Sequence, residues 1–317
     1  MVERYDIGSR AKKGAASGAL AIVGCFGAVK LVSSPNATRK YSRRRIASSQ
    51  SIPTHTQNMT EQQNPPIALV TGAALRLGRA IALDLAKRGW RIGVHHRTSS
   101  AEADALVAEI ERAGSKAVAL QADLTCEDEL RRLVRACAEK LGAPTCLINN
   151  AARFEWDTID TLDWAGWQAE LDVNLRAPVF LTQEIARTLP EDASGCVINM
   201  IDQRVWRLAP EFFSYTIAKS ALWTATRTLA QALAPRIRVN AIGPGPVLKN
   251  RWQSEAEFEA ECLKTPLRRR ATAEEICSAV RFLLDTPSMT GQMIALDSGQ
   301  HLAWDDTPGG KPPANPR

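Results

Sequence analysis

The segment of residues 66–85 restricts the possible fold more than any other part of the sequence. A short apolar run, PIALVT, leads directly into the turn GAALRLGR, and an amphipathic helical pattern follows. A strand, a tight turn and a helix N-terminus in this order present free backbone N–H groups and the positive end of the helix dipole to an anion. The segment therefore predicts a cradle for the phosphates of a dinucleotide, built from Gly72, Arg76, Leu77 and Gly78. The usual motif has three glycines, and Arg76 at the middle position puts a cation beside the phosphates.

The second predicted strand, residues 91–96, ends in a basic and polar cluster. An acidic residue at this strand end would bind the ribose 2′-hydroxyl of NAD, whereas a basic residue accommodates the 2′-phosphate of NADP. The strand closes with His96, and Arg97 and Thr98 follow it. These residues predict a site for NADP(H).

Strand and helix patterns continue to alternate along the chain. We expect helices at 100–113, 127–141, 164–189, 214–233 and 272–285, and further strands at 116–121, 145–148, 195–200, 236–242 and 292–296. This alternation favours a single α/β domain of the Rossmann type, with a doubly wound parallel sheet and right-handed crossovers. Two more strand ends supply cofactor candidates, namely Asp123 with Leu124, where an acid can meet the adenine, and Asn150 with Ala151.

The positive charge of the chain is concentrated at its N-terminus. Residues 1–58 hold ten Lys or Arg and two acidic residues, a net charge of +8, while the other residues hold 30 basic and 32 acidic ones, a net charge of −2. The net charge of the predicted domain therefore does not indicate binding to nucleic acid. No apolar run reaches the roughly 18 residues that a membrane span needs. Seven scattered cysteines without a CxxC pair favour reduced thiols in a cytoplasmic compartment and indicate no metal site.

We expect three parts in the chain: a basic, disordered extension at 1–64, the α/β domain at 65–304, and a disordered tail at 305–317. The extension is rich in Arg and Ser and poor in acids, so import into an organelle as a transit peptide stays open. Alternatively, translation starts at Met59, and the preceding residues are a mis-assigned upstream extension.

Residues 199–219 carry a pattern suited to proton transfer. Asp202 lies thirteen residues before Tyr215, and Lys219 follows one helical turn later. In a helix the i, i+4 spacing puts Tyr215 and Lys219 about 6 Å apart at Cβ. The ammonium would there favour the phenolate and lower a pKa that starts near 10. Taken alone, a YxxxK match is a weak signal, because chance matches are common and an exposed helix face explains most of them. Asn174, a polar residue in an apolar stretch, is either a buried amide with a partner or a local helix-bending one.

Six motifs occur in a recognisable order. They are TGxxxxxG at 71–78, NNA at 149–151, Asn174, YxxxK at Tyr215 and Lys219, the turn at Pro244 and Gly245, and TGQ at 290–292. With these motifs, residues 66–302 resemble the short-chain dehydrogenase/reductase family. The resemblance implies that Tyr215 moves the proton, that Lys219 also holds the nicotinamide ribose, and that Asn174 holds a water molecule linking Lys219 to solvent. It further implies cofactor contacts from Pro244, Gly245 and Val247.

Two departures from the commonest family pattern narrow the resemblance. The usual catalytic serine is replaced by Asp202, and the middle glycine of the turn is replaced by Arg76. Together with the run at 96–98 and with Phe154 after the NNA motif, they look like the pteridine reductase branch, which reduces biopterin and folate-type rings with NADPH. The resemblance implies that Arg76 reaches both cofactor phosphate and pterin, and that Phe154 stacks on the pterin opposite the nicotinamide. Asp202 and Tyr215 would contact the same ring.

The resemblance thus implies NADPH-dependent reduction of a dihydropterin, biopterin or folate-type ring, with hydride transfer and a Tyr, Lys and Asp proton relay. Burial in an apolar pocket would raise the pKa of Asp202 and make it a proton donor near neutral pH. One alternative is an NADPH-dependent reductase of another carbonyl or imine, such as a 3-oxoacyl thioester, although a carboxylate would repel its oxyanion. Another is a non-catalytic NADP-binding sensor, against which the retained Tyr215 and Lys219 argue.

The resemblance also implies a homotetramer, assembled through helices 164–189 and 214–233 and the C-terminal strand. Residues 248–267 are expected to cover the substrate. Ala152 and Arg153 stand where the pteridine reductase branch often has serines.

Overall fold

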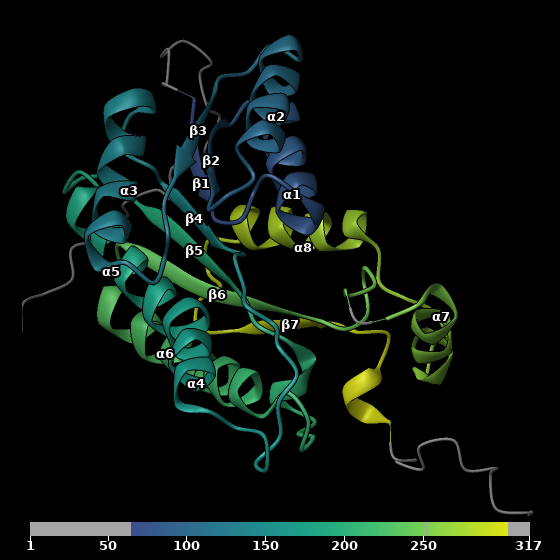
Figure 1. The fold of residues 1–317 in the computed structure, drawn as a ribbon. Helices are drawn as coiled ribbons and strands as arrows, with labels where there is room; N and C mark the ends of the chain where they lie inside the picture. The colour runs from purple at the N-terminus through teal and green to yellow at the C-terminus, as the bar shows by residue number, and fades with distance from the viewer. Residues whose placement is uncertain (1–64, 252, 304–317) are drawn as a thin grey trace, which may run out of the picture. The chain divides into compact units, whose positions relative to one another are not determined.

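Seven parallel strands form the centre of the computed structural model, which describes residues 65–251 and 253–303 (Figure 1). Their order is β3-β2-β1-β4-β5-β6-β7. The strands are β1 (Ile67–Val70), β2 (Arg91–His96), β3 (Ala117–Gln121), β4 (Cys146–Asn149), β5 (Gly195–Met200), β6 (Ile237–Pro244) and β7 (Met293–Leu296). The strand order reverses direction between β1 and β4, and ligands of such sheets bind at the carboxyl ends of the strands beside this reversal. The predicted doubly wound Rossmann-type sheet is confirmed.

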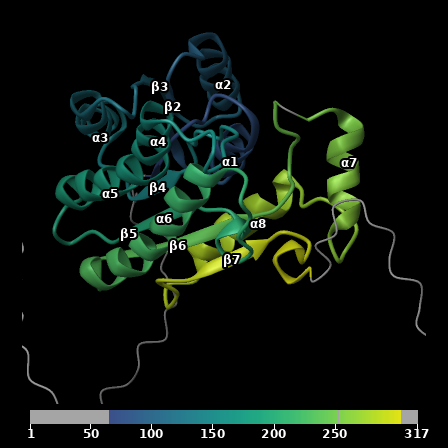
Figure 2. The same ribbon diagram turned by 60° about the horizontal axis from the view of Figure 1, so that its bottom comes forward.

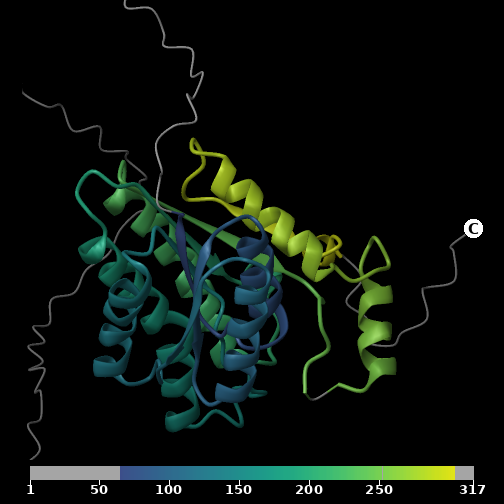
Figure 3. The same ribbon diagram turned by 90° about the horizontal axis from the view of Figure 1, so that it is seen from above.

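Helices cover both faces of the sheet. They are α1 (Arg76–Lys87), α2 (Ser100–Arg112), α3 (Glu127–Leu141), α4 (Trp164–Leu171), α5 (Ala177–Thr188), α6 (Phe213–Leu233), α7 (Glu255–Lys264) and α8 (Ala273–Asp285). Figure 1 shows α1, α2 and α8 on one face and α3, α5 and α6 on the other. Figures 2 and 3 show α7 standing apart from both layers.

The buried residues explain why these segments form strands and helices. β1 and β5 are buried at every position, as expected for parallel strands with helices on both faces. On α1, a stripe of fully buried side chains, including Ile81 and Leu85, packs against one face of the sheet. On α3, Leu133 and Val134 form the corresponding stripe against the other face. One core therefore lies on each side of the sheet.

The single helix predicted at 164–189 is wrong in one respect. A five-residue π-helix, Asp172–Arg176, separates α4 from α5. Its wider turn contains Asn174, whose amide bonds to Glu170 one turn earlier. A 3.6-residue pattern of apolar residues carries no signal for such a local widening, and π-turns of this kind are often found at functional sites.

The region 248–267, which the sequence left without secondary structure, contains α7. A capping box between Ser254 and Glu257 begins this helix. Within the described residues, no helix has the length and apolar character needed to cross a membrane. The predictions for the basic extension and for the C-terminal tail fall outside the described part of the chain.

Candidate active site

A cleft of about 610 Å³ lies at the carboxyl ends of the strands around the reversal of strand order. Every cofactor residue predicted from the glycine turn and from the ends of β2, β3 and β4 lines it. These residues are Gly72, Arg76, Leu77, Gly78, His96, Arg97, Thr98, Asp123, Leu124, Asn150 and Ala151. Phe154, predicted to contact substrate, lines the same cleft together with Ala152 and Arg153.

The glycine turn depends on close backbone contacts. Gly72 has a φ of +61°, in the left-handed region that glycine enters without strain. A Cβ on Gly78 would lie 2.3 Å from the carbonyl oxygen of Gly72 and 2.6 Å from Nδ2 of Asn150. This Nδ2 donates to the carbonyl oxygens of Thr71 and Gly72 at 2.9 and 3.2 Å. Asn150 therefore fixes the turn, and Gly78 lets α1 begin directly against it.

Among the described residues, no side chain caps the N-terminus of α1. The first amide groups of a helix need partners, and an anion is a suitable one. The turn thus has the geometry that a pyrophosphate requires.

His95 is a residue of this cleft that the sequence analysis missed. Its Nδ1 accepts a hydrogen bond of 3.0 Å from the backbone N–H of Gly72, and its Nε2 lies 3.1 Å from the carbonyl oxygen of Ala122. Burial lowers the pKa of His95 to about 4, so the ring is neutral and Nε2 donates. His95 thereby ties the glycine turn to the end of β3. The resemblance to the pteridine reductase branch involved its neighbour His96, in the run at 96–98. No sequence pattern indicated that His95 is the residue that faces the turn.

The end of β2 presents a cation to the cleft. Arg97 is exposed there, next to Thr98. Asp123, at the end of β3, accepts hydrogen bonds from the backbone N–H and hydroxyl of Thr125. These bonds, together with the charge of Arg97, lower the pKa of Asp123. The pair of charges, one basic and one acidic, lies where the ribose phosphate and the adenine were expected.

Arg76 lines the cleft as predicted, but its guanidinium bonds to protein. It donates to the carbonyl oxygens of Leu248 and Lys249 at 3.2 and 2.8 Å. Its φ is +53°, in the left-handed region that favours the glycine usual at this position. The predicted contacts of Arg76 with phosphate and pterin remain predictions.

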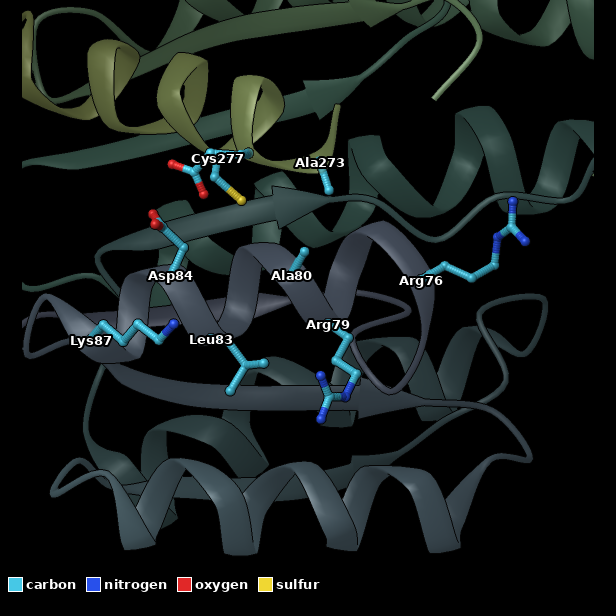
Figure 4. Close-up of a pocket in the computed structure, with 9 residues that line it drawn as sticks. Arg76, Arg79, Ala80, Leu83, Asp84, Lys87, Ala273 and Cys277 are labelled. Atoms are coloured by element: carbon cyan, nitrogen blue, oxygen red, sulfur yellow. The ribbon is translucent and has the colours of Figure 1, made fainter. Parts of the chain in front are cut away.

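A smaller cavity of about 280 Å³ lies between α1 and α8, and Figure 4 shows it. Asp84 on α1 and Cys277 on α8 face each other there, while Arg76 extends away from the helix pair. Arg281 of α8 makes an ion pair with Asp84. The cavity lies beside the helix contact and includes none of the predicted catalytic residues.

Three predicted catalytic residues form a cluster at the end of β5. The phenol oxygen of Tyr215 donates to Oδ2 of Asp202 at 3.1 Å. Oδ1 of Asp202 accepts from the backbone N–H of Arg204 at 2.8 Å. Lys219 is almost fully buried, and its Nζ donates to the carbonyl oxygen of Met200 at 2.8 Å. The same Nζ lies 5.6 Å from the centre of the Tyr215 ring.

The pKa values in this cluster confirm one expectation and correct another. Burial raises the pKa of Asp202, as predicted. The expected lowering of the Tyr215 pKa is wrong for this arrangement, because burial and the carboxylate of Asp202 raise it well above 10. Burial lowers the pKa of Lys219 to about 8, and its ammonium donates to Met200 rather than to the phenol. Tyr215 is therefore a protonated phenol at neutral pH.

Asn174 is completely buried. Its Nδ2 donates to the carbonyl oxygen of Arg153 at 2.9 Å and to Oε2 of Glu170 at 2.6 Å. Its Oδ1 has no hydrogen-bond partner within the described part of the chain. Glu170, a second missed residue, is 2% exposed, and burial raises its pKa to about 7. A glutamate in a helical pattern normally indicates a solvated face, so no sequence pattern singled out this residue.

Phe154 connects the cleft to the catalytic cluster. Its ring meets the Tyr215 ring edge-on, with the centroids 4.7 Å apart. It also stacks on Phe212, with centroids 4.1 Å apart and an interplanar angle of 7°. Phe212 caps α6 in a left-handed conformation, with φ of +54°. One face of Phe154 is therefore covered by protein.

The residues predicted after β6 lie outside the lining of the cleft. Gly245 passes so close to Asp297 that a Cβ would lie 2.7 Å from the Cα of Asp297. Val247 is buried in the core formed with α1 and α8. Pro244 ends β6. The cofactor contacts predicted for these three residues remain predictions.

Comparisons with known proteins agree with this geometry. A family model described as enoyl-(acyl carrier protein) reductase matches residues 72–301. The chain is 32% identical to a 3-oxoacyl-[acyl-carrier-protein] reductase of Synechocystis, over 74% of this chain and 96% of that protein. It is 48% identical to FolM alternative dihydrofolate reductase 1 from Brucella suis in complex with NADP, with a TM-score of 0.71 over 75% of this chain and 96% of that one. For the Brucella canis protein, also complexed with NADP, the identity is 47%, the TM-score 0.72, and the shares covered are 77% and 97%.

The chain belongs to the short-chain dehydrogenase/reductase family. Within that family, its similarity to the two FolM proteins confirms the predicted pteridine reductase-like branch.

Proposed function

We propose that this protein reduces a pteridine ring, either a dihydropterin or a folate-type ring, with NADPH. The observation that carries the proposal is the hydrogen bond from Tyr215 to Asp202, which places a carboxyl group beside the proton donor. A carboxyl of raised pKa suits a ring whose nitrogen atoms take up a proton. The similarity to FolM alternative dihydrofolate reductases at 47% and 48% identity supports the same substrate class.

The cleft fits NADPH. Gly72, Gly78 and the uncapped start of α1 would hold the pyrophosphate, and Arg97 with Thr98 would hold the 2′-phosphate. Both FolM structures contain NADP, which supports this assignment. When bound, the cofactor supplies the hydride, and Tyr215 and Lys219 would hold the nicotinamide ribose.

The protein residues supply the proton. Tyr215 is protonated at neutral pH, and its O–H donates to Asp202. After Tyr215 gives its proton to a ring nitrogen, Asp202 would take up a proton from solvent, which its raised pKa favours, and pass it to the phenolate. The unpaired Oδ1 of Asn174 can hold a water molecule that leads from Lys219 towards solvent.

The second candidate is reduction of a different carbonyl, such as a 3-oxoacyl thioester. The family model and the Synechocystis relative favour it. Against it stands Asp202, because a carboxylate beside the reacting carbon would repel the oxyanion that such a substrate develops. A non-catalytic NADP-binding sensor is the third candidate, and the intact hydrogen-bonded cluster of Tyr215 argues against it.

The test is NADPH oxidation by the full chain with dihydrobiopterin, dihydrofolate and acetoacetyl thioester, each offered alone. We expect turnover of at least one pteridine and little of the thioester. Turnover of the thioester alone would favour the second candidate. NADPH binding without any turnover would favour the third.

We further propose a cytoplasmic homotetramer that associates through α4, α5 and α6 and through β7. Only the family resemblance supports this assembly. Light scattering of the purified protein would measure it, and a monomeric mass would contradict it.

A further inference from the structure

Glu170 is a buried carboxylate on helix α4 that faces the loop carrying Phe154. It is 2% exposed. Its Oε2 accepts from Nδ2 of Asn174 at 2.6 Å, and its Oε1 accepts from the backbone N–H of Glu155 at 3.1 Å. Arg153 lies at ion-pair distance, with Nε 3.5 Å from Oε1. The mechanism described above makes no use of this carboxylate.

The hydrogen bonds of Glu170 and Asn174 hold the backbone on both sides of Phe154. Before Phe154, the carbonyl oxygen of Arg153 accepts from Nδ2 of Asn174 at 2.9 Å. After Phe154, the N–H of Glu155 donates to Glu170. The two peptide groups that flank the aromatic ring are thus bound to two side chains on consecutive turns of one helical segment. Because a backbone bonded on both sides has little freedom, the direction of the Phe154 ring is set from within the protein.

Glu170 also sets the orientation of the Asn174 amide. With Nδ2 committed to Glu170 and to Arg153, Oδ1 is turned away from both acceptors. That oxygen is the buried acceptor without a partner among the described residues. An uncharged apolar residue at position 170 would remove the acceptor that holds Nδ2 in place.

We propose that Glu170 is a positioning residue for substrate, which holds Phe154 beside Tyr215 and keeps the Oδ1 of Asn174 free for water. This inference rests on the proposed function, because it takes Phe154 as the surface on which a flat ring stacks. Glu170 itself touches neither cleft nor catalytic phenol, so it acts through its neighbours.

The charge of Glu170 makes this arrangement sensitive to pH. Burial raises its pKa to about 7; the hydrogen bond from the backbone N–H of Glu155 and the charge of Arg153 lower it, and the charges of Asp157 and Glu155 raise it. From α6, Tyr215 and Lys219 also sense its charge. The ionised carboxylate accepts both hydrogen bonds, whereas the protonated acid turns an O–H towards one of the two donors. Above pH 7, Glu170 therefore accepts both hydrogen bonds, from the backbone next to Phe154 and from the amide of Asn174. Below pH 7, one of these two hydrogen bonds is weakened.

The test compares Glu170→Gln with the wild type in the full-length protein. Glutamine keeps the shape, but its single oxygen can accept only one of the two hydrogen bonds. We expect KM for dihydrofolate to rise about tenfold, in line with the loss of one hydrogen bond to a charged group. The Kd of NADPH should stay within about twofold. In the wild type KM should rise as pH falls from 8 to 6, and this dependence should flatten in the variant.

Glu184→Gln is the matched control. Glu184 on α5 is 3% exposed and bonds to Arg131 and Arg187 at 2.9 Å each, away from the cleft. Its replacement also removes a buried carboxylate, so stability should fall while KM and its pH profile stay as in the wild type. If Glu170→Gln behaves like this control, the proposal is overturned.

Two further measurements separate this proposal from the proposed function. If the wild type reduces no pteridine, crystal structures of the wild type and of Glu170→Gln test whether Glu170 positions Phe154. The quantity to compare is the distance between the centroids of the Phe154 and Tyr215 rings, which is 4.7 Å in the wild type. An unmoved Phe154 would contradict the proposal, and a displaced ring would support it. If Glu170→Gln does not fold, Glu170→Asp replaces it. The shorter acid cannot reach both donors, so KM should rise while its pH dependence persists, and an unchanged KM would again overturn the proposal.

Discussion

The phenol oxygen of Tyr215 donates a 3.1 Å hydrogen bond to a carboxylate oxygen of Asp202, thirteen residues earlier in the chain. A serine hydroxyl at this place would exchange a hydrogen bond with the phenol without changing its charge environment. The carboxylate instead raises the pKa of Tyr215 and, with its own raised pKa, gives the site a second group that can take up a proton. The chemistry of the site therefore depends on this pair.

Replacement of Asp202 by serine should abolish pteridine reduction. We expect kcat to fall by about 100-fold or more, the usual size of a general acid's contribution. The Kd of NADPH should not change, because Asp202 lies outside the lining of the cofactor cleft. Fluorescence titration and NADPH oxidation measure the two effects. Asp285→Ser, at an exposed aspartate that pairs with Arg88, is the control. Full pteridine turnover by Asp202→Ser would remove the main argument for the substrate class.

Arg97 should decide between NADPH and NADH. Arg97→Ala removes the cation expected to meet the 2′-phosphate, so the affinity for NADPH should fall by about tenfold to 100-fold while that for NADH stays the same. Arg112→Ala is a suitable control, since Arg112 is an exposed arginine at the other end of α2 that bonds to the carbonyl oxygen of Ala108. Equal losses of affinity for NADPH and NADH would show that Arg97 does not contact the 2′-phosphate.

Gly78→Ala should destabilise the protein and prevent cofactor binding. Its Cβ would meet the Gly72 carbonyl oxygen at 2.3 Å, so the turn or α1 must move. We expect a loss of about 2 to 3 kcal/mol in the free energy of unfolding, measured by urea denaturation. Gly89→Ala is the comparison, because nothing lies within 4 Å of its Cβ and only the positive φ of +85° opposes it. A Gly78 variant as stable as the Gly89 variant would contradict the structure of the turn.

Lys219 should make stability depend on pH in the alkaline range. Its pKa is about 8 in the folded protein and 10.5 in the unfolded chain. Between these values the unfolded chain holds a proton that the folded protein has lost, so the free energy of unfolding contributed by Lys219 rises with pH through this window. The full change amounts to about 3 kcal/mol.

The measurement compares urea unfolding of the wild type and of Lys219→Met from pH 7.5 to 10.5. Burial raises the pKa of the thiols in the folded protein, so they also make stability depend on pH, but they are shared by both proteins and cancel in the difference. The stability of the wild type relative to the variant should increase as the pH rises. Parallel curves would mean that Lys219 is charged in the folded protein.

The fold and most of the cofactor site could be predicted because they follow from repeated local patterns. Strand runs bounded by helical patterns define a parallel sheet, and the carboxyl ends of its strands must share one edge. Residues as distant in the sequence as Gly72, Arg97 and Asp123 therefore had to meet in one cleft, as they do.

The missed features depend on side-chain directions that no pattern carries. His95 and Glu170 act from positions that look like an ordinary strand end and an ordinary helix surface. The π-turn at Asn174 shifts the helix by only a fraction of a turn. The spacing of apolar residues along the sequence is too coarse to indicate so small a change. The rise of the Tyr215 pKa depends on whether the lysine or the carboxylate contacts the phenol, and spacing alone suggested the lysine.

Arg76, the first residue of α1, donates to two carbonyl oxygens that lie 172 and 173 residues later in the chain, in the loop after β6. If a cofactor phosphate attracted this guanidinium, Arg76 would lose its hydrogen bonds to the two carbonyl oxygens of the loop. The loop after β6 is expected to cover the substrate, so the binding of cofactor and the binding of substrate are then thermodynamically linked. Each of the two ligands must change the binding free energy of the other by the same amount. An arginine in place of the glycine would therefore couple the binding of the cofactor to the position of the loop after β6.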